Sequence, residues 1–219
     1  MAEVSAEPVA PLRRPRLRGY LHLAGAALML ASAFWLWQAA RGTMLRVAVV
    51  VYVCGVTAML ATSATYHVPN WPPRALRALR RADHSTIFLA VAGTFTPIVL
   101  ATMPPTFGTV LLALVWVGAT AGIVVRNVFH NARPWARTVP YVALGWVGVI
   151  TLPWLWRYST TVAWLVAAGG LLYTLGAVVY ARRRPDPWPR WFGYHEVFHA
   201  LTLGAIALHW FAVQQAVSR

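Results

Sequence analysis

The chain has 219 residues, of which 59% are hydrophobic and only 11% are charged, whereas a soluble domain typically carries about 25% charged residues. A chain this poor in charge cannot cover its own surface in water, so the composition excludes a soluble domain and predicts a protein embedded in lipid. The net charge is +14 and all 19 basic residues are arginine, but they fall in short clusters between apolar runs, which indicates loops beside anionic lipid and argues against nucleic-acid binding.

Seven apolar stretches are long enough to cross the hydrocarbon core of a bilayer, which takes about 20 residues. In chain order the predicted spans cover residues 21–40, 47–66, 85–102, 107–125, 139–156, 159–181 and 197–217. The connections are short, so we expect an all-α membrane protein with one seven-transmembrane helix bundle over residues 20–217, preceded by a tail over residues 1–19. The first span is too long for a signal-peptide core of about 7–15 residues, so we expect it to stay in the membrane.

The placement of the arginines predicts the orientation of the bundle, because positive charge accumulates in cytoplasmic loops. Fifteen arginines fall on the side of the N-terminus, and only Arg41, Arg46, Arg157 and Arg219 fall on the other. The N-terminus and the tail are therefore predicted to be cytoplasmic and the C-terminus extracytoplasmic. The expected location is the cell membrane, crossed several times.

Three of the predicted helix ends carry polar groups, which are costly at membrane depth and therefore indicate function. The second span ends with Ser63 and His67, the third begins beside Asp83, and the last begins beside His195 and His199. In the predicted topology all three ends lie at the cytoplasmic face. His195 and His199 are four residues apart and share one face of their helix, as Ser63 and His67 do, which suits a shared metal ion.

Two histidines from one helix and a third from another would leave one position of a zinc ion open, as catalytic zinc sites do. The sequence therefore predicts Zn²⁺ as cofactor, with His67, His195 and His199 as its ligands. Two roles remain open for Asp83. In the first role it hydrogen-bonds the metal-bound water or a ligand histidine. In the second role it caps the start of the third helix. The two roles are compatible.

The string HEVFH at residues 195–199 matches the HExxH motif of zinc metalloproteases, in which the glutamate is the general base. Soluble enzymes of that kind need a third ligand downstream, and here His209 lies about a third of a membrane deeper on the same helix. Peptide hydrolysis is therefore disfavoured, and Glu196 is expected to favour the positive N-terminal end of its helix. Structural roles are predicted for His22, near an interface, and for His209, through packing or a polar interhelical contact.

Four segments, taken in order, resemble the hemolysin III proteins, which belong with the progestin and adipoQ receptors and more distantly resemble alkaline ceramidases. The segments are SATYH at 63–67, DHSTIF at 83–88, AGTFTP at 92–97 and HEVFHAL at 195–201. The resemblance covers the span pattern from about residue 20 to residue 215. It implies a seven-helix fold with zinc near the cytoplasmic face, held at His67, His195 and His199.

The resemblance further implies that Asp83 lies beside the zinc-bound water and that Ser63 supports catalysis near the metal. The leading hypothesis is a zinc-dependent integral membrane hydrolase that acts on a lipid amide or ester, with a role in membrane lipid homeostasis. In it Asp83 is the general base or orients the water, and Ser63 steadies the developing oxyanion. The alternatives are a non-enzymatic receptor or sensor braced by zinc and a pore-forming hemolysin. The expected partners are a membrane lipid and the bilayer, and the oligomeric state is left open.

Overall fold

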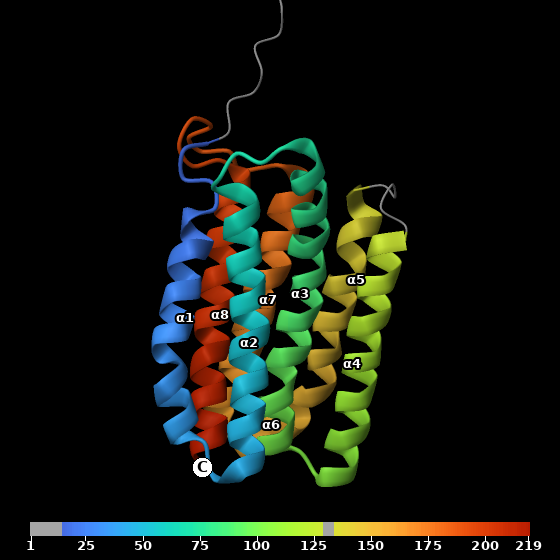
Figure 1. Cartoon of the computed structure of the whole chain (residues 1–219). Coiled ribbons are helices and arrows are strands. Elements are labelled where there is room, and N and C mark those ends of the chain that lie inside the picture. The colour runs from blue at the N-terminus through green and yellow to red at the C-terminus, as the bar shows by residue number, and fades with distance from the viewer. Residues whose placement is uncertain (1–14, 129–133) are drawn as a thin grey trace, which may run out of the picture.

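The computed structural model describes residues 15–128 and 134–219, so most of the predicted tail lies outside the described residues. The described part of the chain folds into eight α-helices and a short 3₁₀ helix, which run up and down beside one another (Figure 1). In chain order they are α1 (Tyr20–Ala39), α2 (Gly42–His67), α3 (Pro73–Thr102), α4 (Pro105–Val128), α5 (Pro134–Trp146), η1 (Val147–Thr151), α6 (Leu152–Tyr158), α7 (Thr160–Arg182) and α8 (Tyr194–Ser218).

Seven stretches of these helices are long and apolar enough to cross a membrane, which agrees with the seven predicted spans. Six are single helices, and the fifth is the stretch Val139–Tyr158. The outer surface is apolar: Leu28, Trp35, Leu114 and Val117 are each more than 60% exposed. The chain is therefore a multi-pass membrane protein, and the side of the membrane on which each end lies stays a prediction.

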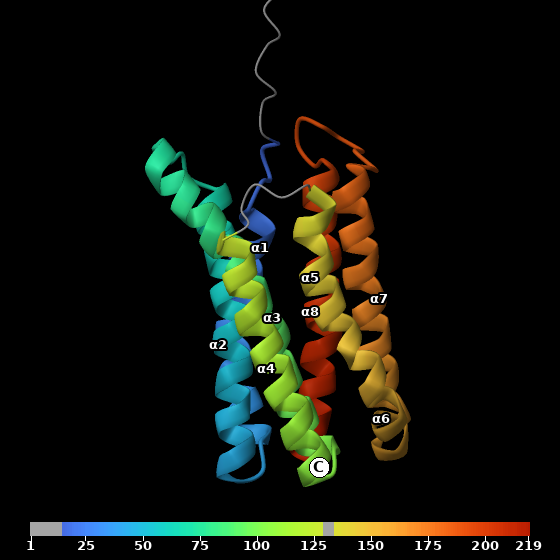
Figure 2. The ribbon, with the colours of Figure 1, turned by 90° about the vertical axis from the view of Figure 1, so that its right-hand side faces the viewer.

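The third helix begins at Pro73, well before the predicted start of the apolar span at residue 85. Proline suits the first turn of a helix, since its missing N–H has no intrahelical partner there. The arginines that follow are good helix formers but raise the polarity of the segment, so an apolar window misses them. Asp83 consequently lies ten residues inside α3, and its predicted role as a helix cap is wrong. Figure 2 shows this first part of α3 leaning away from α7 and α8.

The fifth span is not one regular helix, although the sequence predicted it as one. The chain changes from α5 to η1 and then to α6 before it reaches Tyr158. Pro140 lies inside α5, and another proline stands in the first turn of α6. Each proline removes a backbone N–H from the helical ladder, which favours such breaks.

Packing between the helices brings the end of α2 and the start of α8 to the same end of the bundle. The most extensive contacts join α2 to α3 and α7 to α8, and α8 also packs on α1 and α3. Small residues allow the backbones to approach closely. A Cβ atom placed on Gly55 of α2 would lie 2.7 Å from the carbonyl oxygen of Leu89 in α3. These contacts hold α2, α3 and α8 in fixed register.

Gly122 offers a direct test of the packing between α3 and α4. A Cβ atom at this position would lie 2.3 Å from Cε1 of Phe88, whose side chain is fully buried. We expect Gly122→Ala to lower the free energy of unfolding by about 1–3 kcal/mol, because the ring must leave its site. Unfolding in detergent measures the effect.

Gly170→Ala in α7 is the matched control, since a Cβ atom there meets no atom within 4 Å. Alanine forms helix better than glycine, so we expect the control to be as stable as the wild type or slightly more stable. Equal stability of the two variants would contradict the packing described here.

Candidate metal centre

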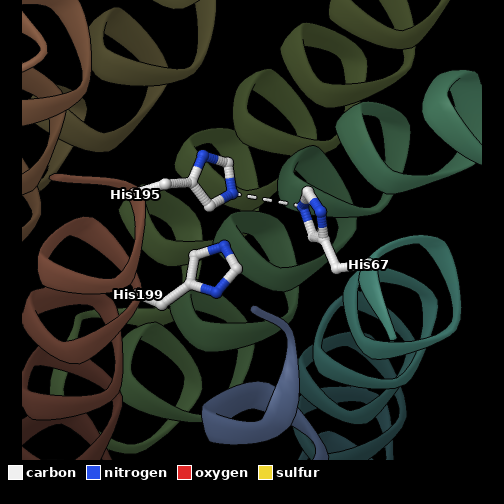
Figure 3. Close-up of side chains that lie close together, drawn as sticks. All are labelled: His67, His195 and His199. Atoms are coloured by element: carbon white, nitrogen blue, oxygen red, sulfur yellow. Dashed lines mark hydrogen bonds between the residues drawn. The ribbon is translucent and has the colours of Figure 1, made fainter. Parts of the chain in front are cut away.

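Three histidines meet where the last residue of α2 faces the first two turns of α8. His67 ends α2, whereas His195 is the second residue of α8 and His199 follows one turn later. Figure 3 shows the three rings turned toward one another across the space between the two helices. His199 is only 2% exposed. The structure thus brings together the three side chains that the sequence predicts as metal ligands.

The distances between the rings fit convergence on one ion. The Nε2 atoms of His67 and His195 are 3.2 Å apart, and one ligand nitrogen from each of the three rings lies within 4.8 Å of the others. The ring centroids are 4.7 Å apart for His67 and His195, 5.4 Å for His67 and His199, and 4.5 Å for His195 and His199. Imidazoles arranged tetrahedrally at a Zn–N distance of about 2.1 Å have centroids about 5 Å apart.

The three imidazole donors also suit a divalent transition metal such as zinc. Imidazole nitrogens suit zinc, copper, iron and nickel, so the donor set alone does not choose among these metals. Among the described residues the group consists of these three histidines, without a cysteine or carboxylate. Three protein ligands would leave a position on the ion for a substrate or water.

Ser63 and Asp83, the two predicted catalytic residues, lie next to each other between α2 and α3. Ser63 precedes His67 by one turn of α2 and is 3% exposed. Its hydroxyl interacts with the carboxylate of Asp83, whose side chain is 14% exposed. Asp83 is not among the residues whose ligand atoms form the three-histidine group. Asp83 is therefore not one of the grouped ligands, whereas Ser63 lies one turn before His67 on α2.

Helix α4 contributes a basic residue that the sequence reasoning assigned only to a connecting loop. Arg126 is 9% exposed and interacts electrostatically with Asp83. The next residue, Asn127, donates a 3.0 Å hydrogen bond to the hydroxyl of Ser85. Both contacts tie the end of α4 to α3 beside the carboxylate. An arginine at the end of an apolar run usually marks a membrane interface, so the sequence offered no signal of this placement.

Glu196 is fully buried and both of its carboxylate oxygens have partners. Oε1 accepts a hydrogen bond from Nε of Arg18 and forms an ion pair with it. Oε2 accepts the backbone N–H of Gly193 at 2.8 Å, which caps the start of α8. A general base needs an oxygen free to reach the proton of its substrate. This arrangement therefore agrees with a helix-end role for Glu196 and argues against the metalloprotease interpretation of HEVFH.

Residues 15–19, called the N-terminal strap below, lie beside the three-histidine group. The backbone N–H groups of Arg16 and Leu17 donate to the carbonyl oxygens of Arg190 and Trp191 at 3.1 and 3.2 Å. The guanidinium of Arg16 also lies 4.4 Å from the centroid of the Trp191 ring. The strap is thus fastened to the connection between α7 and α8 (Figure 1).

The strap ends at Gly19, which lies directly against His67. Gly19 has a φ of +85°, and a Cβ atom there would lie 2.8 Å from Cβ of His67 and from Cγ2 of Val68. Only glycine adopts this backbone conformation without strain. The strap consequently contacts one candidate metal ligand through Gly19 and the helix of the other two through Arg18.

Two further histidines illustrate what the sequence could and could not predict. His209 packs between helices and its Nε2 lies 3.2 Å from the carbonyl oxygen of Val166, which agrees with the predicted polar interhelical contact. His22, for which a structural role was predicted, is buried and its ring stacks on that of His199 with a centroid distance of 3.7 Å. No spacing rule relates residues on α1 and α8, so its place beside the centre was missed.

Comparison with known proteins gives several matches to the chain. A family model described as "Haemolysin-III related" matches residues 11–210. "Hemolysin-3" of Bacillus cereus is 32% identical over 142 residues, which cover 64% of this chain and 62% of that protein. "Hemolysin-3 homolog" of Bacillus subtilis (strain 168) is 32% identical over 132 residues, which cover 60% and 59% of the two proteins.

A human protein is also similar at lower identity. "Monocyte to macrophage differentiation factor" of Homo sapiens is 21% identical over 174 residues, which cover 77% of this chain and 70% of that protein. The matched part of this chain spans less than two thirds of the length of the two bacterial relatives.

Proposed function

Because the chain belongs to the haemolysin-III related family, we propose that it is a zinc-dependent membrane hydrolase that cleaves a lipid amide or ester. The observation that carries the proposal is the buried group of His67, His195 and His199. Three imidazoles at a helix junction match the ligand number of catalytic zinc sites, which keep one position open. Four protein ligands would instead favour a structural metal.

In this proposal the three imidazoles hold the ion and the neighbouring polar pair carries the proton. When bound, zinc polarises a carbonyl group and lowers the pKa of water to about 7. Asp83 would accept a proton from the attacking water and return it to the amine or alcohol that leaves. In the substrate-free site this carboxylate interacts with the hydroxyl of Ser63. The same hydroxyl, turned toward the substrate, would donate to the developing oxyanion.

The position of the centre supports a lipid as the substrate class. The three histidines lie within the first two turns of α8 and at the last residue of α2, so they stand near one end of the spans. A lipid carries its amide or ester bond just below the headgroup, which is the depth expected for residues at the ends of membrane spans. The apolar outer surface suits contact with the acyl chains of the surrounding lipid.

The same arrangement supports a proposed orientation. The end of the bundle that carries the centre is also the end with most of the arginines, including Arg74, Arg77, Arg80 and Arg81 at the start of α3. Positive charge of this kind faces the cytoplasm. We therefore place the N-terminus and the metal centre on the cytoplasmic side of the cell membrane, with the C-terminus outside.

A second candidate function is a zinc-braced receptor or sensor without catalytic turnover. It is favoured by the position of the centre, which joins α2 to α8 beside the N-terminal strap. A metal there would hold the mouth of the bundle in one arrangement. The relatives named hemolysin suggest a third function, lysis, but the described helices present apolar side chains outward and no feature of them supports a water-lined pore.

The variant Asp83→Asn distinguishes the proposed hydrolase function from the receptor function. We expect this variant to keep its zinc and its fold and to lose about 10²- to 10⁴-fold in turnover, because the amide cannot accept the proton. Purified protein in detergent, given a panel of ceramides, other N-acyl lipids and phospholipids, is assayed by mass spectrometry for released fatty acid.

Asp186→Asn is the matched control. Oδ1 of Asp186 accepts the backbone N–H of Tyr194 at 2.8 Å, at the same end of the bundle, and an asparagine oxygen can accept the same bond. Its turnover should equal that of the wild type. If zinc-loaded wild type releases no fatty acid from any lipid of the panel, the proposed hydrolase function is contradicted. The receptor or sensor function then remains.

A further inference from the structure

His22 combines three properties that packing alone does not explain. Its ring is 2% exposed, it lies on the ring of His199, and its Nδ1 and Nε2 atoms have no hydrogen-bond partner among the described residues. A buried polar atom without a partner costs about 1–3 kcal/mol. An apolar side chain of similar shape would fill the same space without this cost. A polar partner that enters the centre would satisfy these nitrogens.

The close approach of α1 and α8 creates the contact between the two rings. Gly25 lies one turn after His22, and Leu203 lies one turn after His199. A Cβ atom on Gly25 would lie 2.5 Å from Cδ2 of Leu203. The missing side chain lets the helices approach at this level, so the rings one turn earlier lie face to face.

The geometry of His22 differs from that of the three candidate ligands. The rings of His67, His195 and His199 meet edge to face, with interplanar angles of 71°, 61° and 60°. The ring of His22 lies nearly parallel to that of His199, at 14° and with 3.7 Å between the centroids. Parallel rings at this distance cannot both direct a nitrogen at one tetrahedral ion. His22 consequently covers the face of a ligand ring instead of joining the ligand set.

We propose that His22 is a positioning residue of the metal centre that also binds the oxygen of an entering ligand. Its stack holds the plane of His199, and one of its ring nitrogens donates a hydrogen bond to a carbonyl, carboxylate or hydroxamate oxygen at the open position of the ion. This role rests on the proposed metal centre. It adds α1 to the two helices that form the site and makes the site selective for oxygen ligands that accept a hydrogen bond.

Two substitutions at His22 distinguish the contribution of the ring stack from that of the hydrogen bond. His22→Phe keeps an aromatic ring and removes both nitrogens, whereas His22→Ala removes the ring as well. Each protein, purified in detergent and stripped of metal, is titrated with Co²⁺, whose visible spectrum reports the number and geometry of ligands. Acetohydroxamate is then added as the oxygen probe, and its dissociation constant is taken from the change in that spectrum.

We expect His22→Phe to bind cobalt with wild-type affinity and spectrum, but to bind acetohydroxamate about tenfold more weakly, the equivalent of one hydrogen bond. We expect His22→Ala also to bind cobalt about 10- to 100-fold more weakly, because residues that orient a ligand have effects of this size. Thermal unfolding of His22→Phe should be unchanged or should occur at a higher temperature, since an unpaired buried polar group is gone.

Each of four results would overturn the inference. The proposed hydrogen bond from His22 would be refuted if the wild type and His22→Phe bind acetohydroxamate equally well. It would also be refuted if cobalt-loaded wild type does not bind acetohydroxamate. Loss of cobalt or a changed cobalt spectrum in His22→Phe would make His22 a ligand. Failure of the wild type to bind cobalt would refute the metal centre itself and this inference with it. Cobalt and hydroxamate binding without lipid turnover would refute only the proposed hydrolase.

Discussion

Purified wild-type protein is expected to carry about one zinc ion per chain, and His67→Ala and His199→Ala are each expected to lose it almost completely. Each substitution removes one of three ligands, and the remaining two nitrogens hold zinc weakly. The two histidines come from different helices, α2 and α8. Loss of metal in both variants would therefore show that the two helices share one ion. Elemental analysis of the detergent-purified proteins gives the stoichiometry.

His84→Ala is the matched control for this measurement. His84 lies at the same end of the bundle, next to Asp83 in α3, but is not part of the three-histidine group. The control should keep its zinc. Thermal unfolding of the same preparations distinguishes loss of a ligand from loss of the fold. If His67→Ala retains its zinc, the proposed three-histidine centre is refuted, whereas the seven-helix architecture is not affected.

The second large effect is expected at Glu196, whose buried carboxylate is paired with Arg18. We expect Glu196→Ala to lower the free energy of unfolding by about 3–5 kcal/mol, because removal of one partner leaves the other charge uncompensated. The N–H of Gly193 loses its acceptor at the same time. Unfolding in detergent, with and without added zinc, measures the cost.

A double substitution tests whether the pair or the helix cap carries this effect. Replacement of both Arg18 and Glu196 by methionine removes both charges and fills the space with apolar atoms. Such replacements are often neutral, so we expect the double variant to recover at least half of the loss. Asp186→Ala, which removes an exposed acceptor at the same end, should cost only about 1 kcal/mol. If the double variant is as unstable as Glu196→Ala, the loss in free energy of unfolding comes from the missing helix cap and not from the ion pair.

The spans and the three-histidine group could be predicted from the sequence because both follow local rules. Apolar length gives the number of spans. The four-residue spacing of His195 and His199 places them on one face, and alternating span directions bring the end of α2 to the start of α8. The structure reproduces this arrangement. The family resemblance is confirmed by the match over residues 11–210.

The contacts around this group could not be predicted because they depend on how distant helices approach. Arg18 and Glu196 are 178 residues apart, and an arginine in a proline-rich tail is typical of a solvent-exposed loop. The stack of His22 depends on the approach that Gly25 allows, and the burial of Arg126 depends on the extension of α4 past its apolar run. The start of α3 was missed because its first turns are polar. The three side-chain contacts depend on tertiary packing, which no periodicity in the sequence encodes.

The fastening of the N-terminal strap to the start of α8 has a consequence for biosynthesis. The residues that surround the ion come from both ends of the chain, and His67 and His195 are separated by 128 residues. The ribosome synthesises the first six spans before the last one. The three histidines of the proposed centre can therefore meet only after the final helix is inserted. In the proposed centre, metal acquisition would therefore be a late step of maturation, and a chain interrupted before Tyr194 would have six candidate spans but only one of the three histidines.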